Sequence, residues 1–326
     1  METNRWIARW ENEGGAVPEI KSSSKRGDGK DSQAGKQPAT GLRRILVPVD
    51  FSPQSLKTLR YAKRLADRFG AKLHLVHVVN PLVFPARHLM LPWVVAETEL
   101  VRNAKKRLKN LAAEFSLPPR PAPFTVRTGA AADEISHVAR ITDADLIAIA
   151  TRGYPGLKHA FLGSTTERVV REAPCPVLVV RDKESQSARE GARRERSSLQ
   201  FRKILVPVDF SESSRLGLDY ALRFARAFGA NLVLFHSIFV QPYVLADEYI
   251  AREVPNLVSA QQDYADEEME KLRRLASQKG HEVETKVVAG SPVEQIGDYV
   301  AKGDVDLIIT STHGQSGLRR VFTGST

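Results

Sequence analysis

The sequence repeats itself over most of its length. The ten residues RRILVPVDFS at 43–52 recur as RKILVPVDFS at 202–211, an offset of 159 residues. Later landmarks recur at an offset of 161 residues, among them the tripeptide Asp-Leu-Ile at 145–147 and again at 306–308. A repeat of about 140 residues is long enough to be a folded domain rather than one turn of a solenoid. The chain of 326 residues therefore contains a duplicated domain.

Each repeat alternates short apolar runs with amphipathic segments. For the first repeat we expect strands at 45–49, 73–79, 124–127, 146–150 and 177–180, and helices at 53–69, 97–115, 131–140 and after 163. The runs at 146–150 and 177–180 are apolar throughout, as in parallel strands that are buried on both faces. Alternation of strand and helix with right-handed crossovers predicts a doubly wound, Rossmann-like α/β domain with a parallel five-stranded sheet.

The first helix has recognisable ends. Ser52 and Pro53 stand where an N-cap and the first helical residue are expected, and Gly70 follows the last apolar residue as a C-cap. Leucine, alanine and phenylalanine recur between them at spacings of three or four. This pattern predicts a helix with one apolar face against the sheet.

Composition changes indicate the domain boundaries. Residues 1–40 combine glycine, serine and scattered charge, so we expect a disordered tail there. The first domain should occupy 41–181, a linker rich in Glu, Arg and Ser 182–200, and the second domain 201–326. The first repeat continues into a final helix and strand that have no counterpart in the second repeat. We therefore expect either that the sequence is a fragment or that the second domain is truncated at its C-terminus.

Charge and cysteine content narrow the class of protein. Lys and Arg number 48 against 38 Asp and Glu, but no aromatic residues interleave with the basic runs as a base-stacking surface requires, so we expect no nucleic-acid partner. No stretch approaches the roughly 20 apolar residues that span a bilayer, so we expect no membrane partner. The single cysteine, Cys175, forms no internal disulfide and is interpreted as a small core residue. A cytoplasmic location follows as the default.

Polar residues follow the predicted strands at the sheet edge where ligands of open α/β sheets bind. Asp50 ends the first strand, where it serves either a ligand or the entry to the next helix. His77 and its copy His236 lie near the end of the second strand. We interpret both histidines as packed or hydrogen-bonded core residues.

The most specific segment follows the fourth strand. Arg152-Gly153, nine residues and Gly163-Ser164-Thr165 are repeated as His313-Gly314, nine residues and Gly324-Ser325-Thr326. Glycine allows a backbone to approach an anion, and the stretch 164–167 reads as a capping box that opens a helix with Ser164 as its N-cap. Free N–H groups at that helix start favour phosphate binding. The alternative is that these glycines only shape a turn.

These residues resemble the universal stress protein family in its tandem two-domain form. The resemblance rests on ILVPVDFS, the LHLVHV strand and the glycine motif followed by APCPVLVV. Family members that bind ATP have the pattern G-x2-G-x9-G-[ST], whose first glycine is Ala150 in one copy here and Ser311 in the other. The resemblance implies an adenosine pocket at the first two strand ends and phosphate contacts in the glycine motif. Carried over by position, the contact residues are Pro48, Asp50, Val78, Arg152, Gly153, Gly163, Ser164 and Thr165 in the first domain, and Pro207, Asp209, Ser237, Gly314, Gly324, Ser325 and Thr326 in the second.

The resemblance implies a regulatory protein of the stress response that binds ATP, with or without Mg²⁺, and acts through nucleotide-dependent conformation and partner binding. It also implies a homodimer or an intramolecular domain pair, formed by strand 177–180, and an unidentified protein partner. We expect no enzyme, or at most a weak ATPase, because the sequence has neither G-x4-G-K-[ST] nor H-x-G-H. The alternatives are a slow nucleotide hydrolase or adenylyl-transfer enzyme and an interaction module that binds no nucleotide.

Overall fold

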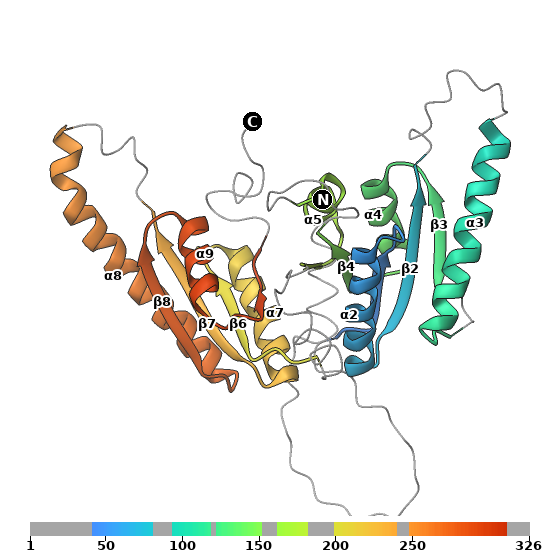
Figure 1. Cartoon of the computed structure of the whole chain (residues 1–326). Helices are drawn as coiled ribbons and strands as arrows, with labels where there is room; N and C mark the ends of the chain where they lie inside the picture. The colour runs from blue at the N-terminus through green and yellow to red at the C-terminus, as the bar shows by residue number, and fades with distance from the viewer. Residues whose placement is uncertain are drawn as a thin grey trace, which may run out of the picture. The chain divides into compact units, whose positions relative to one another are not determined.

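The computed structural model describes residues 41–80, 93–118, 122–151, 162–181, 199–239 and 248–311, with the side chains of 93–97 and 248–257 left aside. The chain divides into two compact units, residues 1–199 and 200–326 (Figure 1). They are called unit 1 and unit 2 below, and each is described by itself.

Unit 1 is a parallel five-stranded sheet with helices between successive strands (Figure 1). Its elements are β1 (Arg44–Pro48), α2 (Pro53–Phe69), β2 (Lys72–Val79), α3 (Trp93–Glu114), β3 (Phe124–Thr128), α4 (Ala131–Ile141), β4 (Leu146–Ala150), α5 (Ser164–Glu172) and β5 (Val177–Val180). The strand order is β3-β2-β1-β4-β5, which confirms the predicted doubly wound fold. The order reverses between β1 and β4, so the switch point where such sheets bind ligands lies beside β1.

Unit 2 repeats this topology with four parallel strands among its described residues. Its elements are β6 (Lys203–Pro207), α7 (Glu212–Phe228), β7 (Asn231–Ile238), α8 (Glu248–Gln278), β8 (Val283–Ala289), α9 (Pro292–Lys302) and β9 (Leu307–Ile308). The order β8-β7-β6-β9 matches β3-β2-β1-β4 of unit 1. Duplication of sequence has therefore preserved strand order.

The helix after the first strand begins and ends as its sequence predicts. The Ser52 side chain accepts a hydrogen bond from the Ser55 N–H, Pro53 is the first helical residue, and Gly70 adopts a left-handed conformation with φ 65°. Ser211 caps α7 in the same way. The caps satisfy backbone groups that a helix leaves unpaired at its ends, so this helix starts and stops at the same place in both units.

An aspartate in the repeated Asp-Leu-Ile tripeptide joins two strands in each unit. The Asp145 carboxylate accepts hydrogen bonds from the backbone N–H groups of Arg43 and Arg44 at 2.9 and 2.8 Å. Asp306 accepts the equivalent pair of bonds in unit 2, from the N–H groups of residues 202 and 203. The tripeptide thus anchors the start of the first strand to the start of the fourth.

The core of unit 1 between the sheet and α4 and α5 contains the single cysteine. Cys175 is buried in a cluster with Leu46, Val76 and Ile147. Burial raises the pKa of its thiol to about 12, because the thiolate would lie in apolar surroundings. The interpretation of Cys175 as a small core residue is confirmed.

The same face of unit 2 is open. Ile147 of β4 is 0% exposed, whereas its counterpart Ile308 of β9 is 41% exposed. Ala132 of α4 is 4% exposed, and Val293 at the matching position of α9 is 47% exposed. In unit 1 this face packs against α5 and β5, and no element in the described part of unit 2 takes their place.

Candidate functional site

A strained turn follows the first strand of each unit. Pro48 ends β1, and Asp50 accepts hydrogen bonds at Oδ1 from the Ser52 N–H and hydroxyl, at 2.9 and 2.5 Å. Between them Phe51 adopts a left-handed φ of 64°, which a residue other than glycine adopts at a cost of roughly 1 kcal/mol or more. In unit 2 Pro207 ends β6, Asp209 accepts the same two bonds from Ser211, and Phe210 has a φ of 63°. Both units therefore have the same strained turn at the carboxyl edge of the sheet, and we include this turn in the candidate site.

Asp50 is a charged group at this edge. Burial raises the pKa of its carboxyl group, but hydrogen bonds from Ser52 and Ser55 outweigh burial, and the net pKa is lowered. The carboxylate is therefore ionised at neutral pH and able to accept a hydrogen bond from a ligand hydroxyl. Asp50 also organises the entry to α2, as the alternative interpretation expected.

An aromatic stack holds the strained phenylalanine in place. The Phe51 ring lies 4.6 Å from the His77 ring, and the Arg107 guanidinium lies 3.8 Å from the Phe51 ring centroid. The Nδ1 atom of His77 is 2.7 Å from the carbonyl oxygen of Val49, which confirms the interpretation of a hydrogen-bonded core histidine. Burial lowers the pKa of His77, so the ring is neutral at pH 7.

Unit 2 builds the same stack with a different third member. Phe210 lies 4.3 Å from His236, and the ring of Tyr264 approaches Phe210 edge-on at 5.9 Å. The Nδ1 atom of His236 is 2.8 Å from the carbonyl oxygen of Val208. Sequence reasoning missed this stack, although the repeated Phe51/Phe210 and His77/His236 at the common offset of 159 residues were a signal that could have found it.

The second strands end in residues of different chemistry. Val78 packs at the margin of the unit 1 core and presents an apolar surface next to β1. Ser237 replaces it in unit 2, where its hydroxyl donates a hydrogen bond to the carbonyl oxygen of Gly290 at 2.6 Å. The Ser237 hydroxyl is therefore already satisfied within the protein.

The start of α5 differs from its prediction. Gly163, not Ser164, is the N-cap, and no side chain caps the helix, so the predicted capping box is wrong. Two contacts place the start of α5 one residue earlier in the chain than predicted. The Gly163 N–H donates to the carbonyl oxygen of Thr151, and the Thr166 hydroxyl donates to the carbonyl oxygen of Ala150, both at 2.8 Å.

Because no side chain caps α5, backbone N–H groups at its start are left as hydrogen-bond donors. The first helical hydrogen bond joins the Glu167 N–H to the carbonyl oxygen of Gly163. The backbone N–H groups of Ser164, Thr165 and Thr166 have no hydrogen-bond partner among the residues that the structure describes. Such groups, together with the positive end of the helix dipole, favour an anion.

The structure describes part of the glycine motif. Arg152, Gly153, Gly314, Gly324, Ser325 and Thr326 lie outside the described residues. Ala150, which replaces the family's first glycine, is the last residue of β4 and has an extended strand conformation. No positive φ is required there, so alanine fits without strain.

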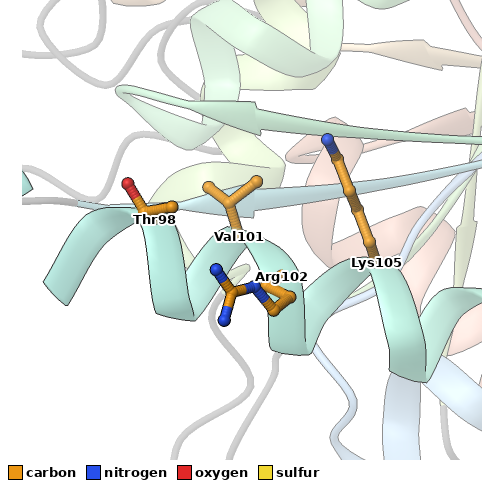
Figure 2. Close-up of a pocket in the computed structure, with 4 residues that line it drawn as sticks. All are labelled: Thr98, Val101, Arg102 and Lys105. Atoms are coloured by element: carbon orange, nitrogen blue, oxygen red, sulfur yellow. The ribbon is translucent and has the colours of Figure 1, made fainter. Parts of the chain in front are cut away.

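A surface hollow on α3 lies apart from these residues. The hollow has a volume of about 360 Å³. Its lining residues Thr98, Val101, Arg102 and Lys105 lie on adjacent turns of α3 (Figure 2). None of the predicted site residues that the structure describes lines this hollow. Within the described ranges, no cluster of three or more His, Cys, Asp or Glu side chains is arranged to hold a metal ion. Over the same ranges, no helix has the length and apolarity to span a membrane.

Two parallel α/β units that repeat one strand order and one strained turn define a tandem doubly wound protein. The model of the universal stress protein family matches residues 41–181 and 200–326. The chain belongs to the universal stress protein family.

Two curated relatives each match a stretch about the length of one unit, and a solved structure covers most of the chain. A universal stress protein of Methanocaldococcus jannaschii is 33% identical over 143 residues, which cover 43% of this chain and 82% of the relative. Universal stress protein G of Salmonella typhimurium is 34% identical over 140 residues, covering 42% of this chain and 97% of the relative. The crystal structure of a universal stress protein from Archaeoglobus fulgidus covers 86% of this chain and 91% of its own, with a TM-score of 0.58 and 18% identity, and shares the tandem fold.

Proposed function

We propose that unit 1 binds an adenine nucleotide, ATP, and that the protein regulates a stress response through nucleotide-dependent conformation and partner binding. The observation that carries the proposal is the uncapped start of α5. Three successive backbone N–H groups without partners among the described residues form an anion site at the carboxyl edge of the sheet. The triphosphate would lie there, against Gly163, Ser164 and Thr165.

The adenosine moiety would occupy the neighbouring strand ends. The Asp50 carboxylate has a lowered pKa and suits a ribose hydroxyl as hydrogen-bond acceptor. Val78 offers an apolar surface for the base, and Pro48 borders the same edge. Arg152 and Gly153 complete the proposed site by their position in the glycine motif.

We propose unit 2 as the weaker site. Pro207 and Asp209 keep the strained turn of unit 1, but the Ser237 hydroxyl is already bonded to Gly290 and provides no apolar surface for a base. Its phosphate contacts would come from Gly314, Gly324, Ser325 and Thr326.

A binding role is favoured over catalysis. Asp50 is a single carboxylate whose Oδ1 already holds the turn, and hydrolysis requires a group that activates water as well as one that binds phosphate. Any ATP turnover should therefore be far slower than the roughly 10 s⁻¹ typical of enzymes. A steady-state turnover rate of about 10 s⁻¹ would instead favour the alternative of a nucleotide hydrolase.

We further propose a homodimer through β5. This strand of four apolar residues, Val177–Val180, forms one edge of the unit 1 sheet and is only partly buried. An unpaired apolar edge strand is a template for pairing with another chain.

The test of nucleotide binding is the substitution Gly163→Val. Gly163 has φ −64° and ψ 146°, a region that valine adopts readily, so the backbone need not change. The branched side chain would fill the space where phosphate approaches, and we expect loss of ATP binding at unit 1 in equilibrium dialysis. The control is Gly297→Ala in unit 2, where an added Cβ has no neighbour within 4 Å, and ATP binding should not change. Unchanged affinity of Gly163→Val would refute the phosphate assignment.

A further inference from the structure

An ion pair lies next to the proposed adenosine pocket of unit 1. The Nε atom of Arg127, near the end of β3, donates to Oε2 of Glu134 in the first turn of α4, at 2.7 Å. The two side chains are 40% and 21% exposed, so the pair lies at a rim and not within the core. Neither residue belongs to the residues proposed above for ATP.

The sheet register places this ion pair next to Val78, where the adenine base of the proposed ligand would lie. Val78 and Arg127 are register partners in the parallel pair β2 and β3. Side chains of register partners point to the same face of a sheet, and adjacent strands are about 4.8 Å apart. Val78 packs against the core cluster that includes residues of α4, and Arg127 contacts α4 through Glu134, so both lie on the α4 face. A base resting on Val78 would therefore have Arg127 at its outer edge.

Arg127 retains unused hydrogen-bond donors. A guanidinium carries five N–H groups, and only the Nε–H of Arg127 is bonded within the described part of unit 1. The single bond to Glu134 orients the planar group and leaves both terminal nitrogens for a ligand. The Glu134 side chain lies close beneath Gly129, since a Cβ at Gly129 would lie 3.1 Å from its Cγ and Oε1 atoms.

Unit 2 has uncharged residues at both positions of this pair. At the offset of 161 residues, Val288 replaces Arg127 and Gln295 replaces Glu134. Val288 is the register partner of Ser237, and the Gln295 side chain lies beneath Gly290 as Glu134 lies beneath Gly129. A pair needed for folding would be required in both units, whereas a contact to the base can be absent from the unit that we propose as the weaker site.

We propose that Arg127 is a specificity-determining residue of the unit 1 site that recognises the purine base, and that Glu134 is its positioning residue. The terminal N–H groups of Arg127 donate to a ring-nitrogen acceptor of the base in the plane of the ring. A two-ring purine extends further from Val78 than a one-ring pyrimidine, so only a purine reaches this donor. The inference rests on the proposed function, because it requires the base to lie at Val78.

The experiment measures dissociation constants by isothermal titration calorimetry with the full chain. The probes are ATP, CTP and inorganic tripolyphosphate, which carries the charge of the nucleotide without its base. For Arg127→Met we expect about a tenfold loss of ATP affinity, which corresponds to about 1.4 kcal/mol, with affinities for CTP and tripolyphosphate unchanged within about twofold. Arg127→Lys keeps the charge but not the fork of donors, and should recover only part of the loss.

Glu134→Gln provides a second and milder variant. It reproduces the residue of unit 2, keeps the shape of the side chain, and should lower the preference for ATP over CTP several-fold through loss of the charge-assisted bond that orients Arg127. Equal losses for ATP and tripolyphosphate in Arg127→Met would mean a general electrostatic effect and would overturn the inference. Unchanged ATP affinity in folded Arg127→Met would overturn it as well and leave the proposed function standing. Failure of the wild-type chain to bind ATP would overturn both.

Discussion

The duplicated isoleucines Ile147 and Ile308 provide a direct test of how far the two cores differ. Both follow the repeated aspartate, and both lie on the strand that pairs with the first strand of their unit. One is 0% and the other 41% exposed. The same substitution, isoleucine to alanine, at both positions should therefore have unequal effects.

The magnitudes follow from burial. Ile→Ala removes three carbon atoms, which at about 0.8 kcal/mol each is a transfer term of about 2.4 kcal/mol for a fully buried side chain. At Ile147 the neighbours Leu46, Val76 and Cys175 enclose the space and a cavity term adds to the transfer term, so we expect a loss of about 3 to 4 kcal/mol. Ile308 keeps a little over half of its burial and faces solvent, so the loss should be roughly 1 to 1.5 kcal/mol.

The assay is native-state hydrogen exchange of the full chain, read by mass spectrometry on peptides from each sheet. Ile147→Ala should lower the opening free energy of amides in β1 and β4, and Ile308→Ala should change those in β6 and β9 by less than half as much. Each variant serves as the control of the other. Equal losses would refute the reasoning, because they would mean that the open face of unit 2 is covered in solution.

Two further predictions concern titrating groups. Cys175 is buried, and its thiol has a pKa of about 12. Iodoacetamide at pH 8 should therefore label it in the native protein only at the rate of local opening, and should label the unfolded chain at once. Rapid labelling of the native protein would contradict the place of Cys175 in the core. Burial lowers the pKa of His74, whose Nε2 lies 2.8 Å from the Thr125 hydroxyl. The unfolded state therefore binds more protons just below pH 6.5, and the free energy of unfolding should fall as pH drops from 7 toward 5. His74→Gln should make that fall smaller in urea titrations, and an identical pH profile would contradict the assigned cause.

Local patterns were sufficient to predict most of the fold. The cap at Ser52, the proline after it and the glycine at position 70 predicted α2 to the residue, because each acts on backbone groups within four positions. The apolar runs predicted the strands of unit 1. The alternation of strands with helices predicted that these strands are parallel. The repeat then predicted the topology of unit 2 without separate reasoning.

The candidate site was predicted only in part. Pro48, Asp50 and Gly163 were recognised from motifs, and all three lie at the carboxyl edge of the strands. The left-handed φ of Phe51 was not predicted, because nothing in its own side chain favours that conformation and the stack on His77 holds it there. The helix start at α5 was misjudged by one residue, because the deciding contacts are with the end of β4.

The sequence by itself determined the duplication, the parallel α/β class, the two caps of α2 and the motif residues, because local patterns in the chain are sufficient to recognise them. Only the tertiary structure decided that the first N–H groups of α5 have no partner among the described residues and that Arg127 lies beside Val78. It also decided that Ile147 is buried and its counterpart Ile308 is exposed. The physical reason is that burial and hydrogen bonding across strands depend on which distant segments meet. Strand pairing brings together residues that are far apart in the chain, and the local sequence around each residue does not show which distant residue it will contact.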